Sequence, residues 1–241
     1  MANQVQYIFD DKNLRVSEPS VFEGRDLKRE EMIVNIGPQH PSTHVVLRLE
    51  VILDGEEIVE VAPHIGYLHR CFEKHAENLP YNQILPFTDR MDYLAAMNNE
   101  HAFAMGVERM LGIENDIPKR VEYIRVVVAE LNRLASHFVA LGSYGMDIGA
   151  VTAFFWTMRD REHILRLLEW VSGARMLYNY VWVGGLFYDL PVGFEERCLE
   201  FTQYLKPKLA ELERVVIENK IFVDLAMSTA RKQIPFYIHV I

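Results

Sequence analysis

The residues best suited to chemistry lie on one short loop, Gly37-Pro38-Gln39-His40-Pro41-Ser42-Thr43-His44. The loop connects two predicted strands, and its two prolines restrict the backbone. A histidine side chain can donate a hydrogen bond and release a proton near neutral pH. The loop could therefore present an imidazole to a pocket, or it could be a rigid β-turn whose histidines are solvated.

Two further segments place acidic and aromatic side chains at predicted helix ends. In Pro86-Phe87-Thr88-Asp89-Arg90-Met91-Asp92-Tyr93, Asp92 can cap the following helix, with Tyr93 in its first turn. In Gly145-Met146-Asp147-Ile148-Gly149, a carboxylate stands between two long helices. Taken alone, these are a helix start and a turn; Asp147 could instead orient a histidine and stabilise its protonated form.

The segment 63–75 combines histidines with Cys71, a composition that invites a metal interpretation. A zinc site is disfavoured because no pair of cysteines lies near Cys71 and His75 to complete the set of ligands. The whole sequence has only two cysteines, Cys71 and Cys198, too few for a disulfide scaffold or for an iron–sulfur cluster held by this chain alone. We therefore expect no metal bound by this chain alone.

The charge balance excludes one further class of function. The chain has 241 residues with 25 basic and 34 acidic side chains, a net charge of −9, which gives no footprint for nucleic acid. Its N-terminus lacks a signal-peptide pattern, and no stretch is apolar enough for a transmembrane helix. We expect a soluble or peripheral, cytoplasmic protein.

The elements that must position these residues indicate an α+β fold. Residues 1–31 are polar and aperiodic, and we expect an extended arm there. Strands are predicted at Met32–Ile36, Val45–Leu53 and Glu57–Ala62, with an Asp54-Gly55 hairpin turn, forming a small antiparallel β-meander. A bundle of long helices should follow over residues 63–223. Its helices are predicted at Tyr93–Leu111, from Pro118 to about Ser143, from Thr152 to about Val183 and, interrupted by Pro207, from Phe194 to about Ile217.

Taken together and in order, the motifs resemble those of one family. They are GPQHPSTHVVLRL, PHIGYLHRCFEK, PFTDRMDYLAAMNNEHA and GMDIGAVTAFFWTMRDREHI with VSGARM. They resemble the D subunit of NADH-quinone oxidoreductase, the quinone-site subunit of respiratory complex I, which is related to the large subunit of nickel–iron hydrogenases. The resemblance runs from about Met32 to Phe222 and implies a hydrogenase large-subunit-like fold, here incomplete.

The resemblance implies three catalytic residues. His44 and Tyr93 would donate hydrogen bonds to the quinone oxygens, where negative charge develops during reduction. Asp147 would pair with His44 and stabilise its imidazolium, a step that could couple electron transfer to proton translocation. His40 would be a further residue of the quinone-site loop.

The resemblance also implies where the electrons come from. The donor would be a [4Fe-4S] cluster on a partner, the B subunit, with Arg70 close to the cluster and raising its potential. Without the resemblance, a surface salt bridge with Glu73 would be the default role of Arg70. The expected partners are the B, C and I subunits of complex I, its membrane-embedded H subunit, and a quinone. The chain would lie peripherally on the cytoplasmic face of the bacterial inner membrane.

Several positions depart from the family pattern. Cys71 stands where glycine is usual, and we expect its thiol to be packed. Leu177 replaces a histidine that follows GARM in many members, which favours a low-potential quinone such as menaquinone over ubiquinone. Asp92 and Ala95 occupy the positions of one hydrogenase CxxC pair, so the soft ligands that nickel needs are absent.

The family's chains are longer, and residues 224–241 match nothing expected there. From this tail we expect the chain to be a truncated or frame-shifted product. The alternatives to an electron-transferring subunit are therefore an inactive, truncated scaffold and a relative of membrane-bound hydrogenases. The absence of the CxxC pair disfavours the hydrogenase relative. The joint presence of His44, Tyr93 and Asp147 disfavours the inactive scaffold.

Overall fold

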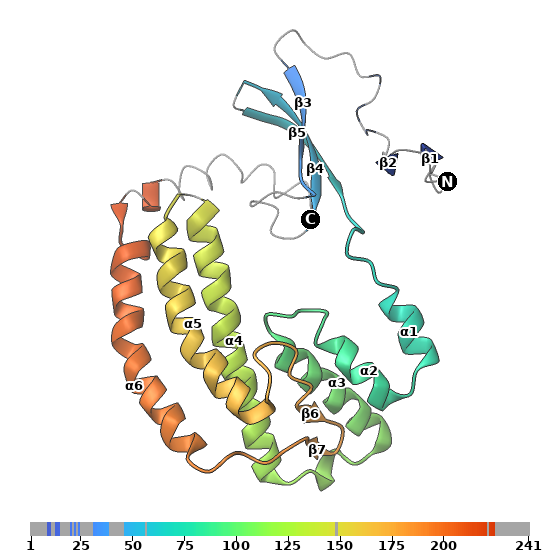
Figure 1. The fold of residues 1–241 in the computed structure, drawn as a ribbon, viewed down its shortest axis with the longest axis vertical. Helices are drawn as coiled ribbons and strands as arrows, with labels where there is room; N and C mark the ends of the chain where they lie inside the picture. The colour runs from blue at the N-terminus through green and yellow to red at the C-terminus, as the bar shows by residue number, and fades with distance from the viewer. Residues whose placement is uncertain are drawn as a thin grey trace. The chain divides into compact units, whose positions relative to one another are not determined.

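The structure, a computed structural model, describes residues 9–10, 13–14, 20, 22, 24, 31–38, 46–55, 57–147, 149–220 and 222–224. The chain divides into two compact units, Met1–Arg70 and Cys71–Ile241. The first contains a three-stranded antiparallel sheet, and the second contains the helices (Figure 1). The predicted α+β class, a small β-meander followed in sequence by long helices, is confirmed.

The sheet has the order β3-β4-β5, with β3 at Glu31–Ile36, β4 at Arg48–Asp54 and β5 at Glu57–His64. The central strand β4 supplies the buried side chains Glu50, Val51 and Ile52. β3 and β5 lie on either side of β4, and each pairs with β4. All three strands were predicted in number and order; two of their six ends agree and the other four differ by one to three residues.

Two of these differences have clear causes. β5 continues through Pro63 to His64, beyond the predicted end at Ala62, because an edge strand tolerates the missing N–H of proline. Asp54 pairs with Glu57 and so belongs to the strand. The turn therefore begins at Gly55, whose φ is +61°, one residue later than predicted.

Gly37 fixes the start of the loop that carries the two candidate histidines. Its φ is +93°, and a Cβ at this position would collide with the Leu47 carbonyl group. Only glycine fits this close approach. The remainder of that loop, residues 39–45, lies outside the described residues. Within the predicted N-terminal arm the structure places two short paired strands, β1 (Phe9–Asp10) and β2 (Asn13–Leu14).

The second unit contains six α-helices among its described residues. They are α1 (Phe72–Asn78), α2 (Tyr81–Thr88), α3 (Ala96–Leu111), α4 (Lys119–Asp147), α5 (Val151–Ser172) and α6 (Phe194–Leu212), with a 3₁₀ turn η2 at Glu114–Asp116 and a π-helical turn η3 at Glu213–Ile217. The long helices α4, α5 and α6 lie side by side (Figure 1). None of the described helices is long and apolar enough to cross a membrane.

The core of this unit is formed where α3, α4, α5 and α6 bring their apolar faces together. It also includes the segment that follows α5, whose Tyr178, Tyr180 and Val181 are buried. α4 contributes a stripe at helical spacing, as the sequence periodicity predicts. Members of this stripe are Ile124, Val128, Leu131, Ala135 and Phe138.

The predicted end of the third long helix is wrong. α5 stops at Ser172 rather than near Val183, because Gly173 adopts φ +79° and donates its N–H to the Glu169 carbonyl oxygen. The chain then forms an irregular segment and a small hairpin of β6 (Val181–Trp182) and β7 (Gly185–Leu186). The apolar residues after Gly173 pack in the core without helical periodicity, which the sequence pattern does not distinguish from a continuing helix.

Other helix limits differ less. α3 begins at Ala96 rather than Tyr93, α4 runs four residues past Ser143, and α6 with η3 matches the predicted Phe194–Ile217 despite Pro207. The helices α1 and α2 were not delimited from the sequence. They have seven and eight residues, which gives too few turns for a clear apolar stripe.

Cys71 precedes α1 with φ 53° and ψ 37°, the left-handed conformation. A residue without a Cβ adopts this conformation most readily, which accounts for the glycine expected from the family pattern. The Cys71 side chain is exposed, so the expectation that its thiol is packed is wrong.

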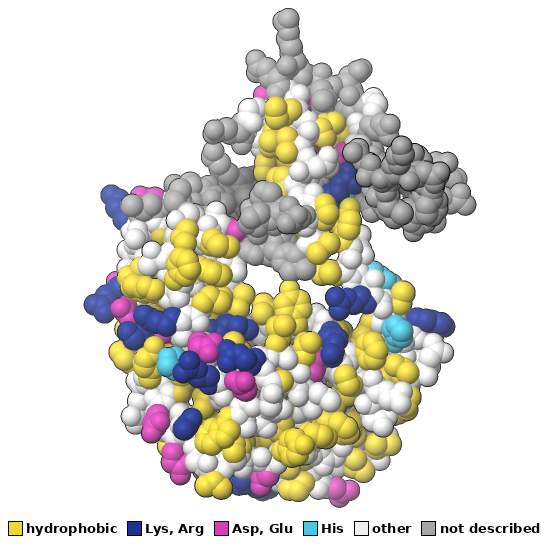
Figure 2. Space-filling view, in the orientation of Figure 1, with side chains coloured by type: hydrophobic (Ala, Val, Ile, Leu, Met, Phe, Trp, Pro, Cys, Tyr) yellow, Lys and Arg dark blue, Asp and Glu magenta, His cyan; other side chains and the backbone are white. Residues whose placement is uncertain are grey.

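Hydrophobic side chains gather on the visible face of the helical unit where α4 ends and α5 begins (Figure 2). The exposed large hydrophobic residues of these two helix ends are Leu141, Tyr144, Val151 and Phe155.

Candidate functional site

Tyr93 lies on a turn between α2 and α3, and its side chain is exposed. Asp92 holds this turn, because its Oδ1 accepts hydrogen bonds from the N–H groups of Leu94 at 3.2 Å and Ala95 at 3.3 Å. The predicted capping role of Asp92 is wrong, because α3 begins at Ala96, its N-cap is Ala95, and it has no side-chain capping bond; Asp92 holds the turn before the helix instead. Tyr93 itself precedes the helix instead of standing in its first turn. The phenol is left accessible on a fixed backbone.

The buried Asn132 of α4 anchors the other side of the same turn. Its Nδ2 donates to the Leu94 carbonyl oxygen at 3.2 Å, and its Oδ1 accepts from the Met97 N–H at 3.0 Å. Both ends of one amide therefore fix the start of α3. Because α4 is a long helix that packs on both α3 and α5, these bonds attach the turn to the helical core.

Two buried carboxyl groups, Asp89 and Glu100, connect this turn to the segment that follows α5. Asp89 follows the last residue of α2, and Glu100 lies in α3; both side chains are fully buried. Together they accept three consecutive backbone N–H groups from the segment after α5: Asn179 to Asp89, and Tyr180 and Val181 to Glu100. The turn and the segment after α5 are thus tied to each other.

Neither acid was singled out from the sequence. Glu100 is four residues from Ala96 and Ala104, both fully buried, so it lies on the buried face of α3. Spacing on that helix face was the available signal, since a carboxyl group among core positions must find donors. Asp89 carried no such signal, because it ends a short helix.

Asp147 is the last residue of α4, and its side chain is exposed. It lies 15 residues after Asn132, which is about 22 Å along a helix axis. Because Asn132 contacts the Tyr93 turn, the structure does not bring Tyr93 and Asp147 together. The predicted pairing of Asp147 with His44 stays a prediction, since His44 lies outside the described residues.

The remaining predicted residues belong to the first unit. Arg70 is exposed, at its C-terminal end. His40, like His44, lies outside the described residues. The proximity of Arg70 to a cluster and the roles of both histidines stay predictions.

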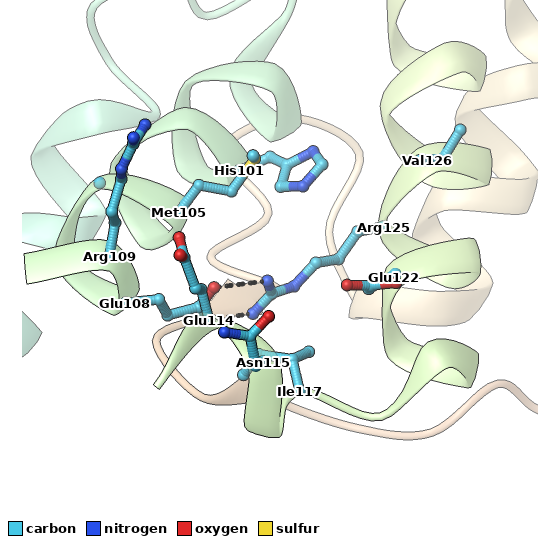
Figure 3. A pocket seen from close by; sticks show the side chains of 11 residues that line it. His101, Met105, Glu108, Arg109, Glu114, Asn115, Ile117, Glu122, Arg125 and Val126 are labelled. Atoms are coloured by element: carbon cyan, nitrogen blue, oxygen red, sulfur yellow. Dashed lines mark hydrogen bonds and ion pairs between the residues drawn. The ribbon is translucent and has the colours of Figure 1, made fainter. Parts of the chain in front are cut away.

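A separate cavity of about 560 Å³ lies between α3 and α4 and contains none of the predicted site residues. Its wall includes the buried Arg125, whose guanidinium bonds both carboxylate oxygens of Glu108 (Figure 3). His101 also lines the cavity; burial, and then the charge of Arg125, lower its pKa. Its imidazole is therefore neutral at neutral pH.

The two cysteines do not form a metal site. Burial raises the pKa of the Cys198 thiol to about 11, so it remains protonated at neutral pH and is a poor ligand. Within the described part of the chain, no group of three or more His, Cys, Asp or Glu side chains could hold a metal ion. Asp92 binds backbone N–H groups through its carboxylate, and the side chain of Ala95 has no atom that could bind a metal. Their correspondence to hydrogenase thiolates stays a prediction.

Comparison with known proteins gives consistent matches. Residues 147–230 match the sequence model of the family described as respiratory-chain NADH dehydrogenase, 49 Kd subunit. The chain is 76% identical over 208 residues to the NADH-quinone oxidoreductase D subunit numbered 1 of Cytophaga hutchinsonii, covering 86% of this chain and 53% of the relative.

Two further relatives are also named as the D subunit of NADH-quinone oxidoreductase. That of Amoebophilus asiaticus is 66% identical over 223 residues, covering 92% of this chain and 55% of its own length. That of Chlorobaculum tepidum is 59% identical over 210 residues, covering 87% and 52%. The chain spans about half the length of the curated relatives it matches.

Proposed function

Because the chain belongs to the family of NADH-quinone oxidoreductase D subunits, we propose that it contributes a quinone site to such an oxidoreductase complex. In this role it passes electrons from a partner subunit to the quinone and acts only within the complex. The observation that carries the proposal is the exposed phenol of Tyr93, held on a turn that Asp92 and Asn132 fix from two sides.

The chemistry required is the reduction of a quinone to a quinol, which takes two electrons and two protons. Negative charge develops on the two quinone oxygens, so a fixed O–H donor beside one of them lowers the barrier. Tyr93 supplies this O–H. A donor held by a rigid backbone needs no reorganisation when the charge appears, which is the advantage of a turn clamped by buried side chains.

His44 is proposed as the second donor, with His40 on the same loop as a further quinone-site residue. Asp147 stabilises the His44 imidazolium, so that His44 stores a proton until the quinone takes it. Loss of that proton leaves the Asp147 carboxylate less compensated, and this charge imbalance is the proposed link to proton translocation.

The electrons are proposed to come from a [4Fe-4S] cluster on the B subunit of the complex, close to Arg70, whose positive charge raises the cluster potential. The C and I subunits and the membrane-embedded H subunit complete the set of proposed partners. This places the chain peripherally on the cytoplasmic face of a bacterial inner membrane. Leu177, in place of a histidine, favours menaquinone over ubiquinone as the acceptor.

Substitution of Tyr93 by phenylalanine tests this function in the assembled complex. Removing the hydroxyl should lower quinone reductase activity by roughly 10²-fold, the typical effect of deleting one such donor. Electron transfer from NADH to ferricyanide, which bypasses the quinone, should be unchanged. Tyr123→Phe, at an exposed tyrosine of α4, is the matched control. Full quinone reductase activity of Tyr93→Phe in an intact complex would favour a scaffold role instead.

A further inference from the structure

Asp89 and Glu100 bring two carboxyl groups together in the core beneath the Tyr93 turn. Both side chains have no exposed surface, and they lie within hydrogen-bonding reach of each other. Two ionised carboxylates at this separation in a buried site repel each other strongly. Their protonation state therefore needs a physical account.

Half of their oxygen atoms are well satisfied. Glu100 Oε2 accepts the N–H groups of Tyr180 at 2.8 Å and Val181 at 2.6 Å, and Asp89 Oδ2 accepts the N–H of Asn179 at 2.9 Å. The other two atoms, Asp89 Oδ1 and Glu100 Oε1, are buried without a donor from the described part of the chain. A proton between the two carboxyl groups would supply the missing donor.

The charged and titratable neighbours do not neutralise the pair. Arg90, on the Tyr93 turn, is exposed and donates its Nη1 to the Pro86 carbonyl oxygen. Tyr178 also faces the pair, but its O–H donates to the Arg175 carbonyl oxygen at 3.1 Å. The charges of Arg161 and Arg175 act on Tyr178. Among the described residues, therefore, no buried cation is paired with either carboxyl group.

We propose that Asp89 and Glu100 share one proton at neutral pH and act as positioning residues, holding the segment 177–181 against the turn that carries Tyr93. The proton on one carboxyl group is donated to the facing oxygen of the other, and the three backbone N–H groups bind the two remaining oxygen atoms of the pair. The carboxyl–carboxylate pair, with one negative charge in place of two, thus connects two segments that are 90 residues apart in sequence. Its importance for quinone reduction rests on the proposed function; its protonation does not.

The electrostatics agree with this geometry. Burial, and then the hydrogen bond and charge of Asp89, raise the pKa of Glu100 to about 9, so the proton resides mainly on Glu100. Burial raises the pKa of Asp89 as well. Unfolded Glu100 releases its proton near the ordinary value of 4.5, so the folded chain holds one proton more between about 4.5 and 9. The stabilisation of the folded state by this proton is complete below about pH 4.5 and is lost as the pH rises toward about 9.

Isotope-edited infrared spectroscopy of the purified 241-residue chain tests the shared proton. With ¹³C-labelled glutamate, the wild-type chain at neutral pH should show the carbonyl stretch of a protonated carboxylic acid. Glu100→Gln should abolish this band. In Asp89→Asn the band should disappear at a lower pH than in the wild-type chain, because the charge of Asp89 no longer raises the pKa of Glu100. Glu122→Gln, at an exposed glutamate of α4, should leave it unchanged. Absence of the band from the wild-type chain would overturn the shared proton.

Amide hydrogen exchange tests the positioning role separately. Glu100→Ala should speed exchange of the Tyr180 and Val181 N–H groups about 10- to 100-fold, because each N–H loses its buried acceptor. Glu100→Gln should retain most of the protection, because its carbonyl accepts the same N–H groups and its amide donates to Asp89. Unchanged exchange in Glu100→Ala would overturn the positioning role.

Unfolding by urea at several pH values gives the third readout. Wild-type stability should fall relative to that of Glu100→Gln as the pH rises from about 5 to about 9, and equal slopes would contradict a held proton. These measurements need no quinone. If they succeed while Tyr93→Phe retains full quinone reductase activity, the shared proton and the positioning role stand and the proposed quinone site fails.

Discussion

Arg125 and Glu108 show how the helical unit places charges in its core. Their side chains are only 2% and 3% exposed, and they form a two-pronged ion pair between α3 and α4. The same guanidinium donates to the carbonyl oxygens of Trp182 and Gly185, while Glu108 Oε1 accepts the Gly184 N–H. These bonds fix the β6–β7 hairpin against both helices, so the pair organises a segment with little regular structure of its own.

Removing one partner of this ion pair should be costly. Arg125→Ala leaves the Glu108 carboxylate buried without its cation, and we expect a loss of about 3–5 kcal/mol in the free energy of unfolding. Arg133→Ala removes one partner of the exposed Arg133–Glu130 pair and should cost about 1 kcal/mol or less. Urea unfolding of both variants measures the difference.

The double variant Arg125→Met/Glu108→Leu provides the complementary control. It removes both charges together, so it should recover much of the stability that Arg125→Ala loses. A small loss in Arg125→Ala, similar to that of Arg133→Ala, would contradict a structural role for the buried pair.

The helices α4 and α5 approach each other closely at Gly142. A Cβ on the buried Gly142 would clash with Thr157 Oγ1 and come within 3.2 Å of Phe154 Cα. This contact lies in the last turns of α4, close to Asp147. It allows the two longest helices to pack along each other on either side of the Gly149 turn.

Two glycine substitutions should therefore have opposite effects. Gly142→Ala should lower the free energy of unfolding by about 1–3 kcal/mol, because the helices must separate to accept a methyl group. Gly106→Ala, in α3, meets no atom within 4 Å and should raise it by about 0.5–1 kcal/mol through better helix propensity. Thermal or urea unfolding distinguishes them; a stabilising Gly142→Ala would contradict the close approach.

Elements with strong periodicity could be predicted from the sequence, and those fixed by tertiary contacts could not. The alternation in β4 and the apolar stripe of α4 identified the meander and the longest helix. The hairpin after Gly173 is held by buried carboxyl groups and by Arg125, partners 57 to 90 residues away. No local pattern encodes such contacts. Tyr93 and Asp92 could be chosen from their motif, and Glu100 could have been found from its place on the buried face of α3, whereas Asp89 carried no such signal.

The residues proposed for quinone reduction are spread along the sequences of both compact units. Tyr93 and Asp147 belong to the helical unit, while Arg70 belongs to the unit that contains the meander. Because the chain spans about half the length of its curated relatives, the assembled complex is the object on which this proposal must be tested.

Cross-linking with a photoreactive quinone tests whether a quinone binds beside Tyr93. In the complex that contains this chain, the label should reach the tryptic peptide Met91–Arg109, which carries Tyr93, and the peptide Glu30–Arg48, which carries His40 and His44. An excess of unlabelled quinone should suppress both labels, because specific binding is saturable. Labelling of other peptides alone, or labelling that excess quinone does not suppress, would contradict a quinone site at Tyr93.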